Sequence, residues 1–170
     1  MKEYAPFFEW FEKDRKELGV VEELLESVNR MGRTGYYSPQ IYRPDPPDCV
    51  CLNSSAALVA LEVSEVVCEK AARLTAQGNQ VMRVWRPGEL TTRVAELLAE
   101  KDKKIYHGGP YAEIVASLFT DEPLVTPEHA DTELSSASFG PYKQLTAAFL
   151  LLSYNPNTKT YPVVALRIVQ

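Results

Sequence analysis

The chain has 170 residues, of which 45% are hydrophobic and 24% are charged, and its formal net charge is -5. These proportions are those of a globular protein with a sizeable core, and they exclude a disordered chain. The longest apolar run, residues 145–152, is too short to cross a bilayer, and Met1–Tyr4 does not begin a signal peptide. We therefore expect one domain over residues 1–170, located in the cytoplasm and without membrane contact.

Helices and strands alternate along the predicted chain. Apolar residues from Phe7 to Val28 recur at helical spacing, and a polar turn at residues 53–57 separates two β-rich runs, which is typical of a hairpin. The order of elements predicts an α/β protein with a central mixed β-sheet flanked by helices. The expected elements are a helix over 6–31, an irregular approach over 36–47, strands over 48–52 and 58–64, a short helix over 65–77, a strand over 81–85, a helix over 89–106, a strand over 114–119, loop or short helix over 120–141, and strands over 145–154 and 161–169.

The predicted hairpin brings two carboxylates face to face. If Leu52 pairs with Leu58, Asp48 lies opposite Glu62, and directly opposed β-carbons are about 4.5–5.5 Å apart. Like charges at that range repel, so a divalent metal with hard oxygen ligands between them is the simplest explanation. Without metal the repulsion is a net cost, and Glu62→Gln is then expected to be neutral or stabilising. A slipped register, or an exposed strand end at Glu62, would remove the pairing.

A lysine lies within the apolar face of the helix predicted over 89–106. On a wheel of about 100° per residue, Lys101 falls in the middle of the apolar stripe, which includes Ile105. Lys104 lies on the margin of the stripe, and Lys103 points away from it. An ammonium at such a position needs a negative partner, and the hairpin carboxylates are the available anions. The alternative is that Lys101, near the helix end, extends its amine into water.

The spacing of the acidic residues resembles a known family. Pro47-Asp48, thirteen residues and then Glu62-Val63-Ser64 is similar to the motif of the PD-(D/E)XK phosphodiesterase superfamily. The resemblance covers about residues 5–120 and implies a restriction-endonuclease-like core. It also implies that the two acidic residues hold Mg²⁺ or Mn²⁺, with the Val63 carbonyl as a further ligand, and that the protein is a nuclease acting on DNA or RNA.

The motif lysine is where the chain departs from the family, because Ser64 occupies that position. Some members similar to this chain supply the lysine from a following helix. Lys101 fits that role, where it would orient the attacking water or stabilise the pentavalent phosphate, and Lys104 and Lys70 are rivals. Without a lysine at the site, the domain would bind without cutting.

The charge distribution is compatible with a nucleic-acid partner. Residues 70–104 carry 8 basic and 4 acidic groups in an otherwise acidic chain. Such a basic island could meet phosphates, or it could be an ordinary solvated helix surface. The sequence also allows a homodimer.

Two other functions remain open. The first is a non-catalytic interaction protein on the same fold, which Ser64 and the acidic net charge favour. The second is a small-molecule hydrolase that uses Asp121, Glu122 and His129. Cys49 and Cys51 form an isolated C-x-C pair, which we interpret as buried free thiols.

Overall fold

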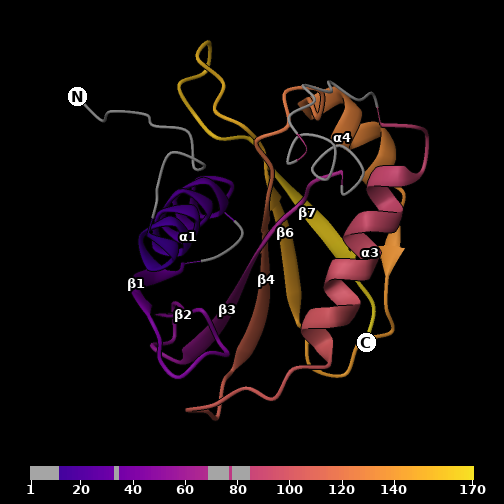
Figure 1. The fold of residues 1–170 in the computed structure, drawn as a ribbon. Coiled ribbons are helices and arrows are strands. Elements are labelled where there is room, and N and C mark those ends of the chain that lie inside the picture. The colour runs from indigo at the N-terminus through magenta and orange to yellow at the C-terminus, as the bar shows by residue number, and fades with distance from the viewer. Residues whose placement is uncertain (1–11, 33–34, 69–76, 78–84) are drawn as a thin grey trace.

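The computed structural model describes residues 12–32, 35–68, 77 and 85–170. Its centre is a seven-stranded mixed sheet with the strand order β1-β2-β3-β4-β6-β7-β5. Helix α1 covers one face of the sheet, and α3 and α4 cover the other (Figure 1). The predicted α/β class, a mixed sheet flanked by helices, is therefore confirmed. The elements are α1 (Lys13–Arg30), β1 (Tyr37–Ile41), β2 (Cys49–Leu52), β3 (Leu58–Glu65), α3 (Glu89–Asp102), β4 (Glu113–Phe119), α4 (Pro127–Leu134), β5 (Ser138–Phe139), β6 (Ala147–Leu151) and β7 (Val163–Ile168).

The centre of the sheet is parallel and covered on both faces. Strand β4 pairs in parallel with β3 and with β6, whereas β2 and β7 add antiparallel strands on either side. Strands covered on both faces read as nearly continuous apolar runs, as β3, β4 and β6 do. Within β3 only Glu62 combines a charge with complete burial, which makes it the exceptional residue of the sheet.

Two apolar cores lie on opposite sides of the sheet. The buried stripe of α1, which includes Leu24, packs against side chains of the sheet such as Leu61. On the other face, the stripe of α3, which includes Val94 and Leu98, packs against residues such as Ala116. Because side chains alternate along a strand, Glu62 points from β3 towards the α3 side.

The end of α3 is fixed by a long-range contact. The helix ends at Asp102, whose carboxylate accepts the backbone N–H groups of Lys143 (3.0 Å), Gln144 (2.7 Å) and Leu145 (3.1 Å). The predicted helix continued to residue 106 and placed Ile105 in the core. That prediction is wrong, because the chain leaves the helix after Asp102 and Ile105 is 79% exposed.

Asp102 should make a pH-dependent contribution to stability. Burial by itself raises the pKa of Asp102, but the backbone hydrogen bonds outweigh it and the pKa is lowered. The ionised carboxylate therefore stabilises the fold above the unfolded-chain pKa of about 3.9. We expect Asp102→Asn to cost about 1.5–3 kcal/mol at pH 7, as for hydrogen bonds to a charged group. Urea unfolding from pH 7 to pH 2 should show this difference shrinking below pH 4; a constant difference would contradict it.

Three other expectations have different outcomes. The proline-rich approach contains a strand, β1, with a register irregularity between Tyr37 and Gln40. The short helix predicted over 65–77 lies largely outside the described residues; β3 continues to Glu65, and residues 66–68 are not helical. The strand predicted over 81–85 lies outside them as well, apart from Trp85, which is in no strand.

None of the helices in the described ranges has the length and apolar character needed to cross a membrane.

Candidate functional site

The hairpin has the predicted register. Leu52 pairs with Leu58, and Cys49 pairs with Leu61, so the alternative of a slipped register is wrong. Asp48 directly precedes β2 and is 3% exposed. Its Oδ2 atom accepts the backbone N–H of Val63 at 2.8 Å. The carboxylate of Asp48 is therefore turned across the end of β2 towards β3.

The sequence explains why this place in the sheet is open to side chains. Continued by two residues, the β2–β3 register would put Pro47 opposite Val63. Proline has no N–H and cannot donate to the Val63 carbonyl. That carbonyl instead accepts Lys101 Nζ at 3.2 Å, while Asp48 takes the Val63 N–H. Two charged side chains thus replace a strand's backbone at this position.

Glu62 is the centre of the site. It is completely buried, and its Oε2 atom lies 3.0 Å from Lys101 Nζ and 2.6 Å from Lys104 Nζ. Lys101 is 8% exposed. Its amine therefore does not extend into water, and the alternative that placed it there is wrong. The Oε1 atom of Glu62 is buried and accepts no hydrogen bond within the part of the chain that the structure describes. One oxygen of Glu62 is therefore neutralised by lysines, and the other is available.

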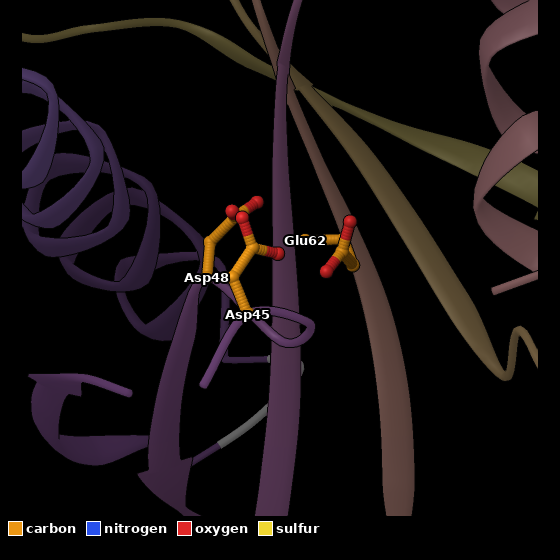
Figure 2. Close-up of side chains that lie close together, drawn as sticks. All are labelled: Asp45, Asp48 and Glu62. Atoms are coloured by element: carbon orange, nitrogen blue, oxygen red, sulfur yellow. The ribbon is translucent and has the colours of Figure 1, made fainter. Parts of the chain in front are cut away.

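A third carboxylate, missed by the sequence prediction, completes the cluster. Asp45, Asp48 and Glu62 each offer an oxygen within 4.8 Å of the others. Figure 2 shows Asp45 and Asp48 side by side, with Glu62 across the ribbon of β3. Asp45 is exposed and also lies 3.3 Å from Lys13 Nζ. The sequence held one signal for it, an aspartate three residues before Asp48 across two prolines, but the course of that loop could not be predicted.

The surroundings concentrate negative charge beside α1. Glu17 is buried, and the burial, together with the nearby charge of Asp48, raises its pKa. It lies 3.4 Å from Lys13 and 3.6 Å from Arg43. A fourth carboxylate thus borders the cluster, and burial is the main cause of its raised pKa, to which the charge of Asp48 adds.

Lys104 is a cation beside the same group of carboxylates. Burial would lower its pKa, but the hydrogen bond to Glu62 and the further carboxylates outweigh burial, so the pKa is raised. Lys104 therefore stays charged at neutral pH. The side chain is 33% exposed, so it connects the buried carboxylate to the surface.

The donor set fits a hard divalent cation. Ca²⁺, Mg²⁺ and Mn²⁺ prefer oxygen ligands, and carboxylates are the commonest protein source of them. Asp45, Asp48 and Glu62 provide such oxygens from one strand and the loop beside it, and Oε1 of Glu62 has no hydrogen-bond partner among the described residues. The Val63 carbonyl, expected as a further ligand, accepts Lys101 in this structure.

The other candidate residues have structural partners. Glu122 accepts the backbone N–H of Cys68 and the indole N–H of Trp85, both at 2.6 Å, and His129 Nδ1 lies 3.1 Å from the Leu124 carbonyl. These contacts link the loops that carry Glu122 and His129 to neighbouring parts of the chain.

The remaining predicted positions have separate outcomes. Cys49 and Cys51 are buried free thiols, as predicted, and burial raises the pKa of each to about 12. Ser64 lies two residues beyond Glu62 on the same face of β3. Lys70 lies outside the described residues.

Comparisons with known proteins identify no relative. No family model matches the chain, and neither a curated protein nor a solved structure matches it.

Proposed function

We propose that this protein is a metal-dependent phosphodiesterase that cleaves DNA or RNA. One observation carries the proposal: Asp48 and Lys101, far apart in the sequence, bond the backbone N–H and the carbonyl of Val63, and Lys101 also pairs with Glu62. A buried carboxylate with one oxygen bound to lysines and the other oxygen available suits a site that holds both a cation and a phosphate.

The residues have separate roles in this proposal. Asp45, Asp48 and Glu62 would hold Mg²⁺ or Mn²⁺, which supplies an activated water and neutralises charge on the phosphate. Lys101, held by Glu62 and the Val63 carbonyl, would orient the attacking water. Lys104, which reaches the surface, would meet the developing charge of the pentavalent phosphate.

The fold agrees with the proposal at a coarse level. A restriction-endonuclease-like core places its acidic residues on neighbouring strands of a mixed sheet, and here they lie at the start of β2 and on β3. The motif lysine would come from α3, since Ser64 occupies the usual position. We propose membership of the PD-(D/E)XK superfamily on this arrangement.

The direct test is cleavage by the purified protein. A panel of single- and double-stranded DNA and RNA is incubated with Mn²⁺ or Mg²⁺, and the products are resolved by size. Cleavage that a chelator stops and metal restores supports the proposal. Intact substrates across the whole panel would overturn it.

Mn²⁺ should stabilise the native protein. If Mn²⁺ binds only the folded state, an Mn²⁺ concentration of about ten times Kd adds about 1.4 kcal/mol to the free energy of unfolding. For a domain of this size, that gain raises Tm by a few degrees. In the double variant with Asp48→Asn and Glu62→Gln the shift should vanish. Differential scanning calorimetry with and without millimolar Mn²⁺ measures it for each protein.

A matched control loses the same charge elsewhere. Glu128 and Asp131 are both exposed on α4, which contacts the start of α3, whereas Lys101 lies in the last turn of α3. The double variant with Glu128→Gln and Asp131→Asn should keep the full response to Mn²⁺. An equal response in the site variant would show that the ion binds elsewhere.

The second candidate is a non-catalytic interaction protein on the same fold. The double lysine contact on one oxygen of Glu62 favours it, because these cations already neutralise the carboxylate. Binding of Mn²⁺ with no turnover, together with a protein partner recovered in pull-downs, would favour this function over the first.

A further inference from the structure

An isoleucine protrudes beside the site. Ile105 is 79% exposed, whereas the other large exposed apolar residues in the described part of the chain are 42–45% exposed. Leaving such a side chain in water forgoes about 1.5–3 kcal/mol of burial. Single surface apolar residues are common, so exposure by itself proves nothing. The way in which Ile105 is held makes it distinctive.

Residues 103–107 alternate between inward and outward positions. Lys104 and Tyr106 are half-buried, whereas Lys103, Ile105 and His107 are exposed. The segment continues from the lower end of α3 and passes beneath the sheet towards β4 (Figure 1). It therefore presents one apolar side chain between an exposed lysine and an exposed histidine.

The two inward side chains of the segment are anchored to the site and to α3. Lys104 bonds Glu62 through its amine, and its carbonyl accepts the Gln144 amide at 2.9 Å. The Tyr106 hydroxyl donates to the Lys101 carbonyl at 2.8 Å. The residues on either side of the outward isoleucine are therefore fixed in place.

A further contact joins the segment to the loop that carries Asp45. The backbone N–H of His107 donates to the Pro46 carbonyl at 3.0 Å. Because its neighbours on both sides are held by these contacts, Ile105 is held outward. It cannot turn into the core without a change in those contacts. The same contact brings the segment next to the loop that carries Asp45.

We propose that Ile105 inserts between base steps of a nucleic-acid duplex while Lys103 and His107 lie along its phosphates. This inference rests on the proposed function and names how the same site would engage its substrate. Apolar wedges of this kind, isoleucine among them, unstack neighbouring bases and kink the duplex. Charge complementarity supports the choice of partner: residues 103–111 contain no acidic residue, and Lys103 is exposed, while Lys104 is paired with Glu62. Phosphates would be attracted to this segment and repelled by the neighbouring carboxylates unless metal is bound.

The test uses duplexes that carry 2-aminopurine at successive positions, with Ca²⁺ in place of Mg²⁺ so that binding is observed without turnover. Wild-type protein should raise the fluorescence at one position, because an unstacked 2-aminopurine is brighter. Ile105→Ser should abolish that rise and weaken duplex binding by about tenfold or more, the scale of losing the burial of one isoleucine side chain. Met31→Ser is the matched control, because Met31 is exposed at the far end of α1 from Lys13, which contacts Asp45.

The outcomes separate this inference from the proposed function. Equal fluorescence and equal affinity in Ile105→Ser and wild type would overturn the wedge alone. Ile105-dependent binding without cleavage in Mg²⁺ or Mn²⁺ would support the wedge and overturn the nuclease. No binding of any duplex by the wild type would overturn the wedge, whatever the cleavage assay shows for single strands.

Discussion

Lys101→Met is expected to lower cleavage of a nucleic-acid substrate by at least about a hundredfold, the usual cost of losing one transition-state contact. Methionine fills a similar volume without a charge to solvate, so the fold should persist. Binding of Mn²⁺ should persist or strengthen, because one of the two cations on Glu62 Oε2 has been removed. A cleavage assay in Mn²⁺, with calorimetry to confirm folding, measures each effect.

Lys103→Met is the matched control for this prediction. Lys103 is exposed and is proposed above to lie along the phosphates, whereas Lys101 and Lys104 are the lysines that contact Glu62 in the described part of the chain. Its substitution removes the same charge and leaves the contacts of Glu62 in place. Its loss should weaken only salt-sensitive binding. Equal activity in the two variants would remove Lys101 from the mechanism, and Lys104→Met would then be the next variant to assay.

Glu62→Gln is expected to destabilise the protein by roughly 3–5 kcal/mol in chelator, the cost of breaking a buried ion pair from one side. The opposed carboxylates alone predicted a neutral or stabilising change. The structure alters that expectation, because Lys101 is 8% exposed and would lose its charged partner. Guanidinium unfolding in chelator gives the free energy of unfolding for wild type and variant.

A double-variant cycle separates an ion pair from a packing effect. Adding Lys101→Met to Glu62→Gln removes the unpaired ammonium and should recover most of the lost stability. Glu96→Gln, exposed on α3 and 3.3 Å from Arg93, is the control for loss of a surface pair and should cost at most about 1 kcal/mol. If Glu62→Gln is as stable as wild type, the lysine contacts are not a source of stability.

The hairpin could be predicted because local signals agree there. The polar turn between Leu52 and Leu58 and the apolar residues on either side determined the register, and that register placed Asp48 beside β3. Lys101 could be placed by helical periodicity, since the helix around it is regular. These two local rules together predicted most of the candidate site before any contact was known.

The missed features depend on distant parts of the chain. The end of α3 is fixed by hydrogen bonds from the backbone of residues 143–145. The sequence near Ile105 therefore gave no indication that the helix ends at Asp102. Asp45 reaches the cluster through a loop whose course local propensity does not determine. Periodicity describes regular elements, whereas these positions depend on where elements end.

The irregular strand β1 has a consequence for how the molecule behaves in a crowded solution. Ser38 has a left-handed φ of 55°, and Pro39 has no N–H to offer an incoming chain. Exposed sheet edges are templates for aggregation, and such bends and prolines are a common defence. At the opposite end, β5 has only two residues. Both borders of the sheet are therefore poor templates, so a homodimer built by joining sheets edge to edge is disfavoured, and any self-association would have to use another surface.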